Sequence, residues 1–247
     1  MDVDLVEGCA GPDPLLDVAM AHALLDLVAS GQRRPVIRCY RPLATVAFGR
    51  RDRFLDGFPD AVAASRRHGF APVIRAAGGR AAAYDEGCLI LDEVMPAGAS
   101  SGGIRERFAA DAHRQAGALR ALGVDARVGE VRGEYCPGEF SVNARGRVKL
   151  IGAAERIVRG AWLHSSVVVV ESATAIREVL IDTYSALGLD WDPDTTGAMA
   201  DEAAGVGLED VRRAFLDAYA ASYELSRASL GELELARAGE LLERHRP

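Results

Sequence analysis

The order of helical and strand-like segments along the chain limits most strongly how it can fold. Apolar spacing predicts helices over residues 14–30, 58–68 and 104–122, and helix again from residue 173 onward. Strand patterns cover residues 36–40, 44–48, 71–75, 88–91, 125–130, 139–143, 147–151 and 162–170. Since strands follow one another in groups between helices, the pattern predicts an α+β fold, a mixed β-sheet flanked by helices, and not a regular βαβ series.

Length and charge narrow the class of protein. The 247 residues are enough for one large domain, and 49% apolar with 26% charged residues is an ordinary globular balance. The formal net charge of −7 argues against nucleic acid or an anionic membrane as a general partner.

The cysteines and the N-terminus bear on compartment and metal binding. Cys9, Cys39, Cys88 and Cys136 form no CxxC pair and no zinc-ligand spacing with histidine, so we expect reduced thiols and no metal site. The first residues are acidic, without a basic or apolar leader, and the chain has no apolar run of membrane-spanning length. These features predict a cytoplasmic protein.

A loop of small residues separates two predicted strands. It contains Gly78 and Gly79, which allow a ligand to approach the backbone closely, and its N–H groups could face phosphate or carboxylate oxygens. Arg75 ends the preceding strand and could bind the same kind of anion. The alternatives are a tight hairpin without a ligand and, for Arg75, a surface ion pair.

Three further residues could carry chemistry. Lys149 lies among apolar residues of a predicted strand, where a fixed ammonium could contact an acyl carbonyl, or where the side chain could simply face water. Cys136 lies in a turn near Arg132 and could be a nucleophile or an ordinary loop cysteine. His164 opens a strand, as a ligand donor or as a structural histidine.

Several segments, in this order, resemble the lipoate-protein ligase and octanoyltransferase family. They are residues 16–25, 35–50, 75–88 and 146–155, followed by the strand that His164 opens. The resemblance implies a biotin/lipoate ligase-like catalytic domain over residues 1–180, with residues 181–247 as a short helical C-terminal part of the same domain. Ala77, Arg80, Cys88, Glu155 and Ser165 depart from the family pattern.

The resemblance also implies a reaction and a site. The favoured reaction attaches a lipoyl or octanoyl group to a lysine of a carrier domain through an acyl-adenylate made from ATP with Mg²⁺. Lys149 would be catalytic. The substrate would contact Arg75, Gly78, Gly79, Arg80, Ala81, Tyr84, Gly152, Ala153, His164 and Ser165.

Two alternatives stay open. One is an octanoyltransferase that needs no cofactor, takes octanoate from acyl carrier protein and holds it as a thioester on Cys136. The ligase is favoured over it because the spacing from Cys136 to Lys149 does not match that branch. The other is an inactive acyl-adenylate-binding protein, or one subunit of a two-part ligase.

The expected partners are carrier proteins. They are the lipoyl domains of 2-oxoacid dehydrogenases or the glycine cleavage H-protein, together with acyl carrier protein or a separate accessory subunit in the alternative reactions. Because such carriers are often acidic, we expect a locally basic docking face on this acidic chain.

Overall fold

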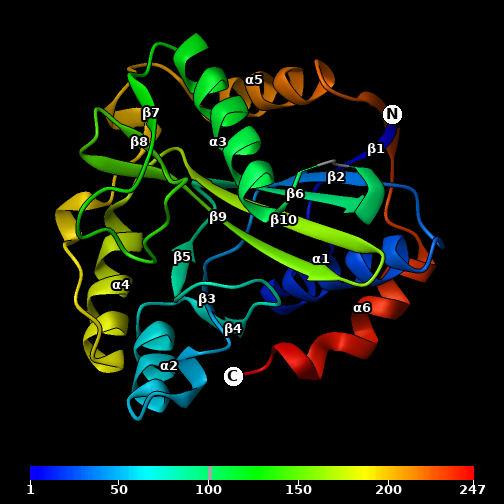
Figure 1. The fold of residues 1–247 in the computed structure, drawn as a ribbon. Coiled ribbons are helices and arrows are strands. Elements are labelled where there is room, and N and C mark those ends of the chain that lie inside the picture. Colours follow the sequence, from blue (N-terminus) through cyan, green and yellow to red (C-terminus); the bar gives the residue numbers. More distant parts are fainter. Residues whose placement is uncertain (100–101) are drawn as a thin grey trace.

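An eight-stranded mixed β-sheet forms the centre of the protein (Figure 1). The structure, a computed structural model, describes residues 1–99 and 102–247. The strands follow the order β11-β1-β2-β6-β10-β9-β8-β7; β1 pairs in parallel with β11 and β2, and the other pairs are antiparallel. Their bounds are β1 Asp2–Glu7, β2 Val36–Tyr40, β6 Cys88–Pro96, β7 Ala126–Val128, β8 Val142–Ala144, β9 Val148–Val158, β10 Ala161–Val169 and β11 Glu224–Ala228.

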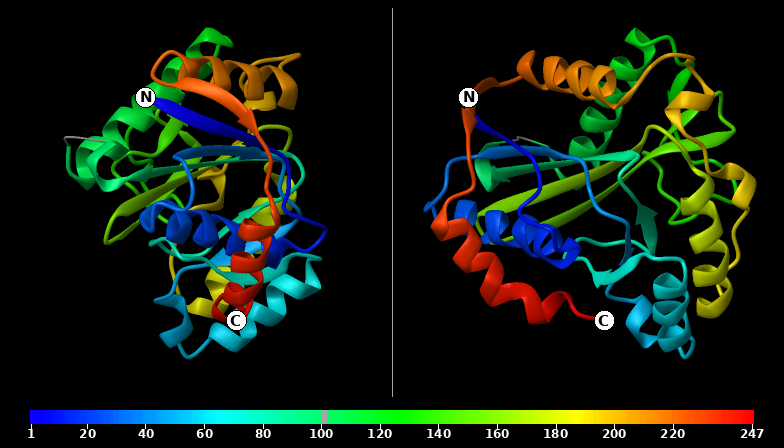
Figure 2. Two further views of the ribbon diagram at one scale, coloured as in Figure 1. Left: turned by 90° about the vertical axis from the view of Figure 1, so that its right-hand side faces the viewer. Right: turned by 180° about the vertical axis from the view of Figure 1, so that it is seen from behind.

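A small second sheet and the helices complete the layers (Figure 2). In the small sheet β3 (Thr45–Phe48) lies between β4 (Ala71–Ile74) and β5 (Ala82–Tyr84). The α-helices of the described residues are α1 Pro14–Ala29, α2 Phe58–Arg67, α3 Ile104–Ala121, α4 Thr174–Leu187, α5 Leu208–Ala220 and α6 Glu232–His245. Helices α3 and α5 pack together on one face of the large sheet, whereas α1 and α6 lie on the other, beside the small sheet, which α2 and α4 cover. None of the described helices is long and apolar enough to cross a membrane.

Strand alternation separates two apolar cores. In β6, Leu89 and Leu91 pack into the core under α3 and α5, while Ile90 packs into the core next to the small sheet. Neighbouring β10 divides in the same way, because Val168 faces α3 and Val167 packs against the other core. The candidate site lies on the side of Ile90 and Val167.

The structure confirms the expected mixed sheet flanked by helices and corrects it in detail. The strands β1, β5 and β11 were not expected. β11 contradicts the expectation of helix alone after residue 173; it is an edge strand with exposed residues on both faces, so its sequence shows no period-two apolar pattern. The expected hairpin exists, but its first strand is shorter than 139–143 and its second extends to Val158. Arg145 and Gly146 turn the chain there with φ of 58° and 72°.

Candidate active site

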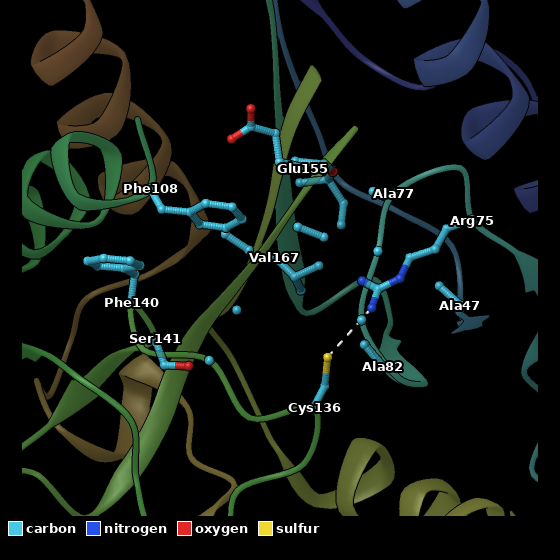
Figure 3. A pocket seen from close by; sticks show the side chains of 18 of the residues that line it. Ala47, Arg75, Ala77, Ala82, Phe108, Cys136, Phe140, Ser141, Glu155 and Val167 are labelled. Atoms are coloured by element: carbon cyan, nitrogen blue, oxygen red, sulfur yellow. Dashed lines mark hydrogen bonds between the residues drawn. The ribbon is translucent and has the colours of Figure 1, made fainter. Parts of the chain in front are cut away.

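A cavity of about 550 Å³ lies between the large sheet, the small sheet and the loop that follows β7 (Figure 3). Small residues create its space, because a larger side chain at these positions would fill it. They are Ala47, Ala76, Ala77, Gly78, Gly79, Ala82, Ala83, Gly152, Ala153 and Ala154. Phe108 and Phe140, stacked with ring centroids 6.1 Å apart, lie on the side opposite Arg75. A mostly apolar cavity with a few polar groups suits an acyl chain.

Cys136 directs its sulfur into this cavity toward Arg75 (Figure 3). The Sγ atom accepts a hydrogen bond from the backbone N–H of Arg80 at 3.2 Å and from Nη2 of Arg75 at 3.6 Å. The sulfur therefore faces one backbone donor and one guanidinium at the wall of the cavity.

The backbone of Cys136 is held in an unusual conformation. Its φ is +42°, in a region that residues with a Cβ rarely adopt and that costs about 1–3 kcal/mol. The Cys136 N–H donates to Tyr184 Oη at 2.8 Å, and that hydroxyl donates to the Ala81 carbonyl at 2.9 Å. Lys149 Nζ donates to the Cys136 carbonyl at 2.9 Å. Both peptide groups of this cysteine are therefore fixed by buried side chains from β9 and α4.

Lys149, the only lysine in the sequence, is 2% exposed. Besides the Cys136 carbonyl, Nζ donates to the Tyr135 carbonyl at 3.0 Å and lies 3.5 Å from Oε1 of Glu134. Burial lowers the pKa of Lys149, and the adjacent Glu134 carboxylate opposes that effect. The ammonium group is thus engaged with the cysteine loop, and its expected contact with substrate oxygens stays a prediction.

The glycine loop approaches this cysteine closely. Gly79 has a φ of +97°, and a Cβ there would lie 2.8 Å from Cys136 Sγ. Gly49 directly follows β3 and packs against this loop, since a Cβ on it would lie 1.9 Å from the Gly79 carbonyl oxygen. The Arg80 side chain turns away from the sulfur and bonds Asp52 at 3.1 Å.

Alanine at Gly49 should therefore displace the glycine loop. We expect Gly49→Ala to lower the free energy of unfolding by about 1–3 kcal/mol, because backbone and not a flexible side chain fills the space. Gly117→Ala is the matched control, since that helical position is open and alanine there should be neutral or stabilising. Equal midpoints of urea unfolding for the two variants would contradict the close approach.

Most of the residues expected at the site line the same cavity. They are Arg75, Gly78, Gly79, Tyr84, Cys136, Lys149, Gly152, Ala153 and Ser165. Arg80 contributes its backbone N–H to Cys136, and Ala81 is fully buried with its carbonyl bound to Tyr184. His164 does not line the cavity, because it lies one residue from Ser165 in β10 and so faces the opposite side of the sheet. That alternation was readable in the sequence, whereas the contributions of Phe108, Phe140 and Ser141 were not.

His164 forms a buried charged network behind the cavity wall. Its Nε2 lies 3.0 Å from Oδ2 of Asp111 and its Nδ1 lies 3.8 Å from Oε2 of Glu155, a residue that lines the cavity. Burial by itself would lower the pKa of His164, but the Asp111 and Glu155 carboxylates outweigh it and raise the pKa to about 9.

This network predicts a pH-dependent stability. The folded protein holds the His164 proton more tightly than the unfolded chain, so the contribution is complete below about pH 6.5 and is lost as pH rises through about 9. Over that range we expect the free energy of unfolding to fall by on the order of 2–3 kcal/mol, and His164→Gln to remove this fall. His113→Gln, at an exposed histidine of α3, is the control that should retain it. A decline that persists in His164→Gln would contradict the assignment.

Among the residues that the structure describes, no group of three or more His, Cys, Asp or Glu side chains is placed to hold a metal ion.

Comparisons with known proteins identify the family of the chain. Residues 13–220 match the model of the lipoyl protein ligase A/B catalytic domain, and the chain belongs to that family. It is 30% identical over 179 residues to an octanoyl-[GcvH]:protein N-octanoyltransferase of Geobacillus kaustophilus, covering 71% of this chain and 63% of that protein. For the enzyme of the same name from Anoxybacillus flavithermus the identity is 33% over 142 residues, 58% and 50% of the two chains. The matches thus span between half and two thirds of these relatives.

Solved structures share the fold. Protein Ta0514 of T. acidophilum with bound lipoic acid superimposes with a TM-score of 0.76 at 22% identity, over 99% of this chain and 96% of that one. A lipoate-protein ligase A bound with ATP gives a TM-score of 0.78 at 21% identity, over 99% and 95%. At this identity the likeness establishes the lipoate ligase fold alone.

Proposed function

We propose that the protein transfers an octanoyl or lipoyl group from one acylated carrier protein to a lysine of another, through a thioester on Cys136. The observation that carries the proposal is the placement of Cys136 Sγ inside the apolar cavity, with Arg75 and the Arg80 N–H donating to it. The relatives are named octanoyl-[GcvH]:protein N-octanoyltransferases, which supports an octanoylated glycine cleavage H-protein as donor and a lipoyl domain as acceptor.

The proposed reaction has two acyl exchanges. The Cys136 thiolate attacks the carbonyl of the donor amide, the carbon–nitrogen bond breaks, and the donor lysine leaves as an amine that takes up a proton. The acceptor lysine amine then attacks the thioester and loses its proton, and the thiolate leaves. No oxidant, reductant or ATP is consumed, because an amide is replaced by an amide.

The side chains around Cys136 divide this work. Arg75 and the Arg80 N–H donate to the sulfur and stabilise the negative charge that it carries as the leaving group. Lys149 holds the Cys136 carbonyl and so fixes the direction of the sulfur. The alanines of β3, β5 and β9 leave room for the hydrocarbon tail.

This proposal reverses the order of preference that the sequence suggested. From the sequence the ligase was favoured, because the number of residues between Cys136 and Lys149 does not match the transferase branch. In the structure the loop between β7 and β8 folds back over Gly79 and Lys149. The acyl-adenylate route remains the second candidate. It is supported by a neighbouring cavity that Gly78, Gly79, Arg80 and Arg156 line, a set that could accept phosphate oxygens.

A comparison of acyl donors separates the candidates. An apo lipoyl domain is incubated with the protein and either octanoylated glycine cleavage H-protein without ATP, or octanoic acid with ATP and Mg²⁺. We expect octanoylation of the acceptor lysine in the first reaction only. Modification in the second alone would establish the ligase, and modification in neither, with calorimetric binding of an octanoyl-adenylate mimic, would establish a binding protein.

A further inference from the structure

Five arginines gather beside the mouth of the acyl cavity. Arg50, Arg51 and Arg156 line the neighbouring cavity, which shares residues 76–79 with the acyl cavity. Arg53 and Arg244 lie next to them, since Arg53 follows Arg51 by two residues and Arg244 precedes His245, whose Nδ1 contacts the Ile74 carbonyl just before the glycine loop. In agreement, the pKa of Arg50 is lowered, first by burial and then by the charges of Arg156, Arg244 and Arg53. We call these five residues the arginine rim.

The rim carries positive charge that the described part of the chain does not neutralise. No carboxylate of the described residues lies within 4.0 Å of a rim guanidinium. Three nearby acids are engaged with other arginines: Asp52 with Arg80, Glu155 with Arg107 and Glu243 with Arg246. Nε of Arg156 is buried without a hydrogen-bond partner. The five positive charges repel one another, although the net charge of the chain is −7.

Exposed apolar side chains follow two of the rim arginines in the chain. Phe54, 85% exposed, follows Arg53, and Ile157, 51% exposed, follows Arg156 and lines the rim cavity. Arginine together with aromatic and aliphatic side chains is typical of protein interfaces. The rim also draws on separate elements, namely the segment after β3, the turn at residues 52–54, β9 and α6, so it extends over more surface than one small anion would cover.

We propose that the arginine rim docks an acidic protein surface, that of the acceptor carrier domain next to its lysine. This inference rests on the proposed function and names the face that the partner uses. The rim cavity and the acyl cavity meet at Gly78 and Gly79, against which Cys136 lies, so a lysine from a partner on the rim enters beside the sulfur. Electrostatic complementarity brings the acidic partner to the site.

Charge reversal at the edge of the rim tests the proposal. Arg53→Glu/Arg244→Glu changes two rim residues that do not line either cavity. Arg147→Glu/Arg213→Glu is the control, with the same change of charge at exposed arginines in the β8–β9 turn and on α5, both without a carboxylate partner among the described residues. Initial rates of transfer from octanoylated H-protein to the apo lipoyl domain are measured at several NaCl concentrations.

We expect the rim variant to raise the KM for the lipoyl domain by about tenfold or more at low salt and to flatten the salt dependence, while the control follows the unsubstituted protein. Equal KM values in the two variants would overturn the proposal. It would also fail if the rim variant bound the lipoyl domain normally but lost binding of inorganic pyrophosphate, because the rim would then be a site for a small phosphate. If the unsubstituted protein transfers nothing, the proposed function fails, and calorimetric titration of the lipoyl domain into the same three proteins still decides whether the rim docks it.

Discussion

Cys136→Ser is expected to reduce acyl transfer by a factor on the order of 10³ or more, because a serine hydroxyl is a much weaker nucleophile than a cysteine thiol. Arg75 and the Arg80 N–H would still contact the replaced atom, so the fold should be unchanged. The rate of octanoyl transfer to a lipoyl domain measures the effect. Cys9→Ser is the control, since Cys9 is an exposed cysteine outside the cavity and its replacement should leave the rate unaltered.

If the Cys136→Ser protein kept a transfer rate within a fewfold of the unsubstituted protein, the reaction would not proceed through a thioester on Cys136. If that residual activity also required ATP, the acyl-adenylate route would take its place.

Lys149→Ala should abolish transfer and also destabilise the protein. The substitution leaves Glu134 as a buried carboxylate without its cation and removes the donor to the carbonyls of Tyr135 and Cys136. Removing one partner of a buried ion pair costs about 3–5 kcal/mol, and the Cys136 loop should lose its fixed conformation. Urea unfolding and the transfer rate are the two measurements.

A paired substitution separates stability from activity. In Lys149→Met/Glu134→Gln the orphaned charge is gone and the apolar stem is kept, so a substantial part of the lost stability should return. The transfer rate should stay low, since methionine cannot donate to the Cys136 carbonyl. Recovery of the rate along with the stability would mean that Lys149 has no role in positioning the cysteine.

The amino-acid pattern was sufficient for the elements whose periodicity is strong. α1 and β10 are examples: α1 begins at residue 14 as expected, with Asp13 capping it through the Leu15 N–H, and the apolar run of β10 lies within one residue of its predicted bounds. β5 and β11 could not be found in this way. β5 is a short strand of two alanines and Tyr84, and β11 has exposed residues on both faces. Neither shows an apolar period, and each is defined by its pairing with a neighbouring strand.

The site shows the same division. Arg75, Gly79 and Lys149 were expected together, because the family resemblance orders their segments, and they do line one cavity. The role of Cys136 could not be predicted from its distance along the chain to Lys149. What brings it to Gly79 is a loop conformation fixed by Tyr184, a residue of a helix 48 positions further on.

The acyl-enzyme is the most direct test of the account. The protein is mixed with octanoylated H-protein without acceptor and without ATP, quenched in acid, digested and mapped by mass spectrometry, with and without hydroxylamine. The account predicts an octanoyl group on Cys136 that hydroxylamine releases. Because Lys149 is the only lysine, a label that resists hydroxylamine cannot lie on any other lysine of the chain. An unlabelled Cys136, with octanoate activated only when ATP is supplied, would contradict it.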